Sequence, residues 1–129
     1  MTKLKLLIVD DEKDFVDALA ERLQLRGFQV LTAIDGESAL RIIENDPPQL
    51  VILDIMMPGL SGLDVLQQIK ERTPQIPVIL LTGLGSTAEG TKGMHLGAYD
   101  FLIKPINIDS LIQKMEEAAQ NTRAHSSIP

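Results

Sequence analysis

Three aspartates, a threonine and a lysine each stand where a short apolar run ends. Asp10 and Asp11 follow the first run, Asp54 the third, Thr82 the fourth and Lys104 the fifth. Neighbouring carboxylates cannot all ionise without a counter-charge, which Mg²⁺, a hard cation with a preference for oxygen ligands, supplies. One carboxylate then remains free as a nucleophile, while the hydroxyl and the ammonium hold the anionic group that it attacks. This inventory fits phosphoryl transfer to an aspartate.

The runs that carry these residues alternate with stretches of helical spacing. They cover residues 4–9, 28–33, 50–53, 78–81 and 101–103. Four are nearly continuous in Leu, Ile and Val, which is typical of strands buried on both faces, whereas the more polar run 28–33 predicts an edge strand. Five strand–helix units predict an α/β fold, a parallel sheet with helices on both faces. Ligands bind outside the carboxyl ends of such strands, so the five residues are expected to share one edge.

Composition limits the classes of protein that this chain can belong to. A chain of 129 residues fits one domain, predicted to cover residues 1–121, and residues 122–129 are predicted to form a polar tail or the start of a linker. A net charge of −6 disfavours binding of this domain to nucleic acid or to an anionic membrane, because both attract positively charged surfaces. The lack of cysteine excludes disulfides, thiolate metal sites and a cysteine nucleophile.

The N-terminal apolar run predicts no secretory signal. It stops at Asp10 and Asp11, well short of a signal-peptide core. Nowhere do about 18 apolar residues follow one another, so we expect no membrane span and a cytoplasmic location.

Each candidate residue also has a purely structural interpretation. An aspartate directly after a strand often caps the next helix, and Thr82 can be a capping hydroxyl in the same way. Lys104 can be a solvated surface charge. The argument for a site is that these residues occur together. Four separate strand ends carry chemically complementary groups, and none of the four carries an apolar residue.

Four motifs resemble the receiver domain of bacterial two-component response regulators. They are Leu-Leu-Ile-Val-Asp-Asp-Glu at 6–12, Leu-Asp-Ile-Met-Met-Pro-Gly-Leu-Ser-Gly at 53–62, Leu-Thr-Gly at 81–83 and Gly-Ala-Tyr-Asp-Phe-Leu-Ile-Lys-Pro at 97–105. In this order and spacing they are highly specific, and the resemblance extends over residues 3–119. It implies a doubly wound, flavodoxin-like sheet of five parallel strands in the order 2-1-3-4-5 with five helices, a topology for which a member of this family is a standard example.

The resemblance implies a metal site and a phosphoacceptor. Asp54 resembles the residue that receives a phosphoryl group from a sensor histidine kinase or a histidine phosphotransfer protein. Asp11 resembles a direct Mg²⁺ ligand and Asp10 a ligand through water, and the backbone carbonyl of Met56 would be a further ligand. The function implied is a signalling module whose output domain or partner is unknown, not an enzyme beyond its own phosphotransfer and slow dephosphorylation.

The resemblance also implies a switch. Thr82 and Lys104 correspond to residues that contact the phosphoryl oxygens, and the bond between Lys104 and Pro105 is one that the family holds cis. The family's switch aromatic, three residues before the lysine, is Phe101 here, without a hydroxyl. The surface of the fourth helix, fifth strand and fifth helix would change on phosphorylation and could mediate a dimer.

The fourth helix is predicted over about residues 86–96 and contains two glycines. Glycine costs about 1 kcal/mol relative to alanine inside a helix. Gly90 and Gly93 are therefore expected to weaken this helix, so that it samples more than one conformation.

Two other functions use a similar inventory. Phosphatases of the haloacid dehalogenase type place the nucleophile after the first strand with a second Asp two residues on, whereas Asp10 and Asp11 are adjacent here. A flavodoxin-like flavin carrier needs a phosphate-binding loop where Asp10, Asp11 and Glu12 would repel a phosphate. Release of phosphate over many turnovers would indicate the phosphatase, and a single labile adduct the receiver.

Overall fold

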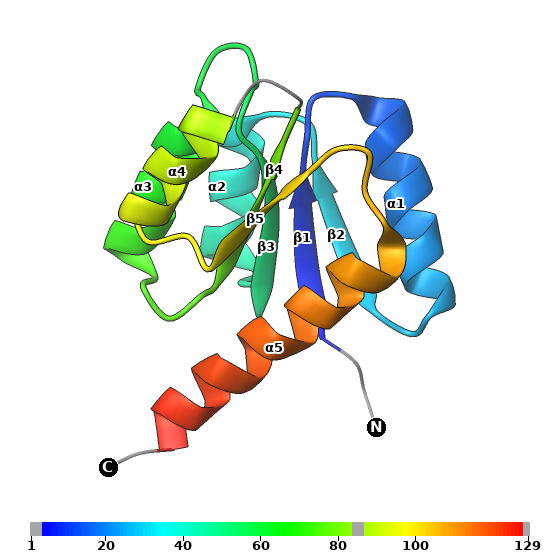
Figure 1. Cartoon of the computed structure of the whole chain (residues 1–129), viewed down its shortest axis with the longest axis vertical. Helices are drawn as coiled ribbons and strands as arrows, with labels where there is room; N and C mark the ends of the chain where they lie inside the picture. Colours follow the sequence, from blue (N-terminus) through cyan, green and yellow to red (C-terminus); the bar gives the residue numbers. More distant parts are fainter. Residues whose placement is uncertain (1–3, 84–86, 128–129) are drawn as a thin grey trace.

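A five-stranded parallel sheet in the order β2-β1-β3-β4-β5 forms the middle layer of the computed structural model (Figure 1). The structure describes the backbone of residues 4–83 and 87–127, and side chains through residue 120. The strands are β1 (Lys5–Val9), β2 (Gln29–Ala33), β3 (Leu50–Asp54), β4 (Val78–Thr82) and β5 (Asp100–Ile103). The helices are α1 (Lys13–Leu25), α2 (Gly36–Asn45), α3 (Gly62–Arg72), α4 (Thr87–His95) and α5 (Ile108–Ser127). The predicted fold class and strand order are confirmed, and β2 is an edge strand as its polarity predicts.

Two apolar cores cover the two faces of the sheet. Residues of α1 and α5 pack on one face, with Leu23 and Met115 fully buried. Residues of α2 and α3 pack on the other, with Leu66 fully buried. Alternate residues of each central strand belong to the two cores, which explains the continuous apolar runs 6–9 in β1, 50–53 in β3 and 78–81 in β4.

Helix ends follow the local sequence. The chain leaves α1 through Gly27, whose φ of 92° is a conformation that glycine adopts at low cost. The side chain of Asp35 accepts a hydrogen bond from the backbone amide of Ser38 at 2.7 Å and so caps α2. Ser61 caps α3 in the same way, by accepting a bond from the amide of Asp64 at 3.3 Å.

The details of β5, α5 and α4 can be compared with the sequence predictions. The run at 101–103 does not form a strand buried on both faces, because β5 lies at the sheet edge and its residues are half-buried or exposed. α5 continues to Ser127, so the predicted boundary at residue 121 falls within this helix, while the extent of the domain stays a prediction. The helix predicted over about residues 86–96 corresponds to α4, and residues 84–86 lie outside the described part of the chain.

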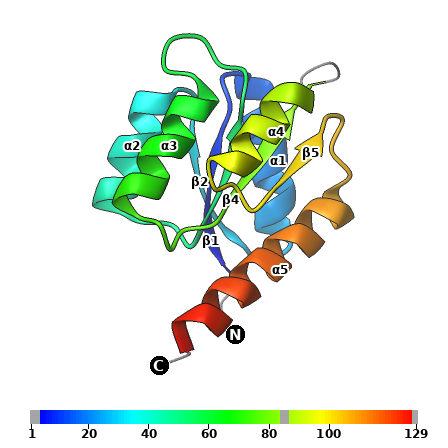
Figure 2. The same ribbon diagram turned by 60° about the vertical axis from the view of Figure 1, so that its left-hand side comes forward.

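The two glycines of α4 have a packing role that their helix propensity does not reveal. Figure 2 shows α4 lying alongside β5. A Cβ on Gly90 would lie 2.8 Å from Cδ2 of Phe101, and a Cβ on Gly93 would lie 2.1 Å from Cδ1 of Leu80. Real Cβ atoms do not approach so closely, so both glycines allow α4 to approach the sheet. Helix propensity alone therefore does not account for Gly90 and Gly93.

Candidate functional site

The register of the strands brings their carboxyl ends to one edge of the sheet. Val9 pairs with Leu53, so Asp10 after β1 is level with Asp54 at the end of β3. Thr82 at the end of β4 pairs with Ile103, and the backbone amide of the next residue, Lys104, donates to the carbonyl of Thr82 at 2.7 Å. Residues distant in sequence therefore meet at a single edge.

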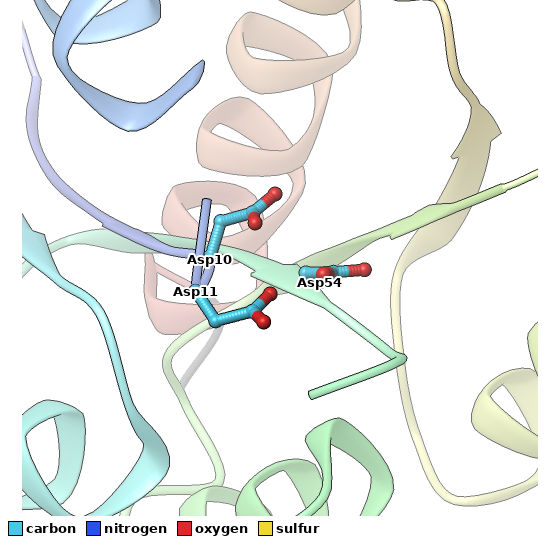
Figure 3. Close-up of side chains that lie close together, drawn as sticks. All are labelled: Asp10, Asp11 and Asp54. Carbon is cyan, nitrogen blue, oxygen red and sulfur yellow. The ribbon is translucent and has the colours of Figure 1, made fainter. Parts of the chain in front are cut away.

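Three carboxylates converge at this edge (Figure 3). Asp10 and Asp11 leave the end of β1 beside Asp54, and one oxygen of each lies within 4.8 Å of the others. Asp10 and Asp54 are buried, whereas Asp11 is exposed. Two buried carboxylates and one at the surface form a concentration of negative charge that opens to solvent on one side.

The ammonium of Lys104 partly neutralises this cluster. Its Nζ lies 2.8 Å from Oδ2 of Asp10, 3.3 Å from Oε1 of Glu12 and 3.9 Å from Oδ2 of Asp54. Burial by itself lowers the pKa of Lys104, but the hydrogen bond to Asp10 and the attraction of Asp54 and Asp10 outweigh burial and raise that pKa above its ordinary value. Lys104 therefore stays charged over the physiological range.

Asp54 is held in an environment that disfavours its charge. Burial first, and the negative charge of Asp10 second, raise the pKa of Asp54 from 3.8 to about 6. The attraction of Lys104 and a hydrogen bond from the Met56 amide, 3.3 Å from Oδ1, act in the opposite direction but do not cancel these causes. A positive charge added beside Asp54 would relieve the repulsion.

Thr82 carries a polar atom that has no partner in the described part of the chain. Its side chain is fully buried, and no hydrogen bond from a described residue reaches Oγ1. Buried hydroxyls are normally hydrogen-bonded, because leaving one unpaired costs about 1–3 kcal/mol. This unpaired hydroxyl stands at the same strand end as the carboxylates.

The loop after Asp54 approaches α3 closely. A Cβ on Gly62 would lie 2.2 Å from the carbonyl oxygen of Asp54, so only glycine fits at that position. Met57 is buried and serves the core, whereas Met56 is 57% exposed beside the cluster. The Lys104–Pro105 peptide bond, for which the resemblance implies cis geometry, is cis.

The structure thus brings together Asp10, Asp11, Asp54 and Lys104, with Thr82 at the adjoining strand end. Phe101 lies elsewhere, on β5 beneath α4, and packs against the core formed by α2 and α3.

Two residues near Lys104 were not predicted from the sequence. Glu12 lies 3.3 Å from the ammonium, and the ring centroid of Phe15 lies 4.4 Å from it. In the sequence Phe15 stands at a four-residue spacing with Leu19 and Leu23, which is typical of the apolar side of a helix. This spacing does not indicate a contact with a residue after β5.

The donor set at this edge fits a hard divalent cation. It consists of carboxylate oxygens, which suit Mg²⁺ rather than softer metals. Burial and the negative charge of Asp10 raise the pKa of Asp54 despite the presence of Lys104, and a cation bound beside Asp54 would favour its charged form. The cluster could therefore hold a metal ion.

Comparison with known proteins gives consistent matches. The profile of the response regulator receiver domain family matches residues 6–116. Over 129 residues the chain is 40% identical to a probable transcriptional regulator, ycf27, of Cyanophora paradoxa, covering 95% of this chain and 54% of that protein. It is 41% identical over 111 residues to the transcriptional regulatory protein CpxR of Escherichia coli (strain K12), covering 86% of this chain and 47% of that protein. The chain thus spans about half the length of these curated relatives.

Solved structures agree with this result. A response regulator receiver domain protein from Clostridium thermocellum superposes with a TM-score of 0.90 at 35% identity, covering 95% of this chain and 98% of that one. NtrX from Brucella abortus, solved in complex with ADP, gives a TM-score of 0.92 at 38% identity, covering 98% of this chain and 29% of that one. None of the helices in the described part of the chain combines the length and the apolar composition that a membrane span requires.

Proposed function

Because this chain belongs to the response regulator receiver domain family, we propose that Asp54 accepts a phosphoryl group from a phosphohistidine of a sensor kinase or phosphotransfer protein. A lone pair on an Asp54 oxygen forms the new O–P bond. The P–N bond to the imidazole breaks, and its electron pair leaves with the nitrogen. Asp54 must be ionised for this attack, and the nearby ammonium of Lys104 favours the ionised form.

The observation that carries the proposal is the buried hydroxyl of Thr82. Its Oγ1 lacks a hydrogen-bond partner among the described residues and stands at the strand end next to Asp54. A phosphoryl group on Asp54 would supply acceptor oxygens to this donor. The group itself would carry a charge of about −2, which the single positive charge of Lys104 would partly offset. We assign Thr82 and Lys104 to the phosphoryl oxygens on this ground.

We propose that the cation is Mg²⁺, held by Asp10, Asp11 and Asp54 with the backbone carbonyl of Met56. When bound, Mg²⁺ offsets the charge of the carboxylates and of the phosphoryl oxygens. The chain itself keeps Asp10 in place through the 2.8 Å ion pair with Lys104, and the amide of Glu12 donates to the other oxygen of Asp10 at 2.9 Å. Asp11 is exposed and accessible to an arriving ion.

The direct test is phosphorylation by a small donor. Incubation with acetyl phosphate and Mg²⁺ is expected to give a single phosphoryl mass increment on Asp54, stable in acid and labile in base. Peptide mapping by mass spectrometry locates the adduct. Labelling of Ser61 or Thr82 instead would contradict the mechanism, and release of phosphate over many turnovers would indicate a phosphatase.

We further propose that phosphorylation changes the surface formed by α4, β5 and α5. Movement of Thr82 toward a phosphoryl group would open space next to Phe101, whose half-buried ring packs against α4 at Gly90. Lacking a hydroxyl, this ring is held by packing alone. The exposed apolar residues Met94, Leu96 and Ile103 on or beside this surface would suit a partner, an output domain or a second copy of the chain.

Hydrogen exchange tests the switch. The amides of α4 are expected to gain protection when beryllofluoride, a phosphoryl mimic, binds with Mg²⁺. The ligand would select one of the conformations that this glycine-containing helix is expected to sample. Exchange of the peptides that cover Thr87–His95 is compared with and without beryllofluoride. Equal protection in both states, with changes confined to the loop after Asp54, would contradict a switch role for α4.

A further inference from the structure

The ammonium of Lys104 lies over the face of an aromatic ring. Its Nζ is 4.4 Å from the ring centroid of Phe15, which belongs to the first turn of α1, whereas Lys104 follows β5. An ammonium within about 6 Å of a ring centroid is attracted by the negative face of the ring. The contact therefore links α1 directly to the lysine of the site.

The ring and the carboxylates are different kinds of partner for the ammonium. Asp10, Glu12 and Asp54 offer oxygens at 2.8, 3.3 and 3.9 Å. The ring offers no acceptor oxygen and no place for a metal ion. A cation bound at the carboxylates would compete with Lys104 for Asp10, whereas it would leave the attraction between the ring and the ammonium in place.

A flexible lysine side chain needs a contact such as this ring if its ammonium is to stay in one place. Its four-carbon chain carries considerable rotamer entropy, and a point charge places little constraint on its direction. The Lys104 side chain is 19% exposed, so the contact with the ring is largely shielded from water, where such contacts are strongest.

We propose that Phe15 is a positioning residue for phosphoryl transfer: its ring holds the Lys104 ammonium at the carboxylate edge. Phe15 acts through Lys104 and does not itself contact the phosphoryl group. The inference rests on the function proposed above, because it assigns Lys104 to the reacting group. The apolar spacing of Phe15 in α1 by itself indicates only a core position.

The competing interpretation is that Phe15 merely fills space. It belongs to the same helix stripe as Leu19 and Leu23, and it packs against the same core. It is less buried than either, however, and together with Lys104 it borders a surface cavity of about 500 Å³. If Phe15 only filled space, leucine would replace it with little effect on the chemistry.

The test compares Phe15→Leu, which keeps an apolar side chain, with Phe15→Tyr, which keeps the ring. The rate of labelling by acetyl phosphate at saturating Mg²⁺ is expected to fall by about two- to tenfold in Phe15→Leu and to stay close to the wild-type rate in Phe15→Tyr. Phe28→Leu is the matched control, because Phe28 is buried in the same core but lies just before β2, at the opposite edge of the sheet. Its labelling rate is expected to be unchanged.

A spectroscopic measurement reports on the contact without any phosphoryl chemistry. The ring current of Phe15 is expected to shift the methylene protons next to Nζ of Lys104 upfield in the NMR spectrum. This shift is expected to disappear in Phe15→Leu and to persist in Phe15→Tyr and Phe28→Leu.

The outcomes separate the two proposals. A wild-type protein that shows the ring-current shift but takes no label would overturn the proposed function. A wild-type protein that is labelled, with Phe15→Leu labelled at the same rate, would overturn the positioning role. Equal slowing in Phe15→Leu and Phe15→Tyr would also overturn it, because the ring would then not be the feature that matters.

Discussion

Replacement of Asp54 by asparagine is expected to abolish phosphoryl labelling and, at the same time, to stabilise the metal-free protein. The loss of labelling follows if Asp54 is the nucleophile. The gain in stability follows because burial and Asp10 raise the pKa of Asp54 to about 6, so that its charge opposes folding at neutral pH. Each unit by which the folded state raises the pKa of Asp54 corresponds to about 1.4 kcal/mol. Because this pKa rises from 3.8 to about 6, removing the charge is expected to add about 2–3 kcal/mol to the free energy of unfolding at pH 7.

The pH dependence of this gain has a definite sign. The folded protein binds the Asp54 proton more tightly than the unfolded chain, for which the ordinary pKa is 3.8. The resulting stabilisation is fully present below that value and is lost as the pH rises through about 6. The asparagine side chain of the variant does not titrate, so the advantage of Asp54→Asn is expected to be largest at pH 7 and to fall to about half at pH 5.

Urea unfolding with chelator present, at pH 7 and pH 5, measures both values. Glu71→Gln is the matched control, since it removes one negative charge from the exposed side of α3 and is expected to change stability by less than about 0.5 kcal/mol. A gain of equal size at both pH values, or a loss of stability, would contradict the assigned environment of Asp54.

Replacement of Asp11 by asparagine is expected to abolish labelling while leaving the fold intact. The variant removes one carboxylate oxygen from the proposed Mg²⁺ site. Asp11 is a cleaner choice than Asp10 because Asp11 is exposed, whereas Asp10 is fully buried and paired with Lys104. Breaking that buried pair would cost several kcal/mol and confuse a loss of metal with a loss of structure.

Labelling by acetyl phosphate over a Mg²⁺ titration is the measurement for Asp11→Asn. The control is Asp14→Asn, another exposed aspartate, in the first turn of α1. It is expected to show the wild-type dependence on Mg²⁺. Labelling of Asp11→Asn at the wild-type rate, or of the wild-type protein in excess chelator, would show that the metal assignment is wrong.

The sequence predicted the sheet and the convergence of strand ends because both follow from local patterns. Apolar runs between helical stretches imply parallel strands, and parallel strands bring their carboxyl ends to one edge. Asp10, Asp11, Asp54 and Lys104 meet there for this reason.

The surroundings of Phe15, β5 and the glycines of α4 depend on distances between elements. Sequence patterns do not contain these distances. Phe15 has the spacing of a core residue, and only the path of the chain after β5 brings Lys104 over its ring. The half-burial of β5 follows from its place at the sheet edge and not from its apolar composition. Gly90 and Gly93 look unfavourable in a helix considered alone, whereas the close approach of α4 to β4 and β5 explains them.

The close contacts of α4 have a consequence for how this sequence can diverge. Position 90 is coupled to the ring at position 101, and position 93 to the side chain at position 80. A larger residue at either helix position requires its neighbour in the sheet to shrink or to move, so the effects of the two changes should not add. Epistasis is therefore expected within each pair: alanine at position 90 becomes acceptable once position 101 is smaller than phenylalanine, and the order in which the two substitutions arise decides which evolutionary path is open.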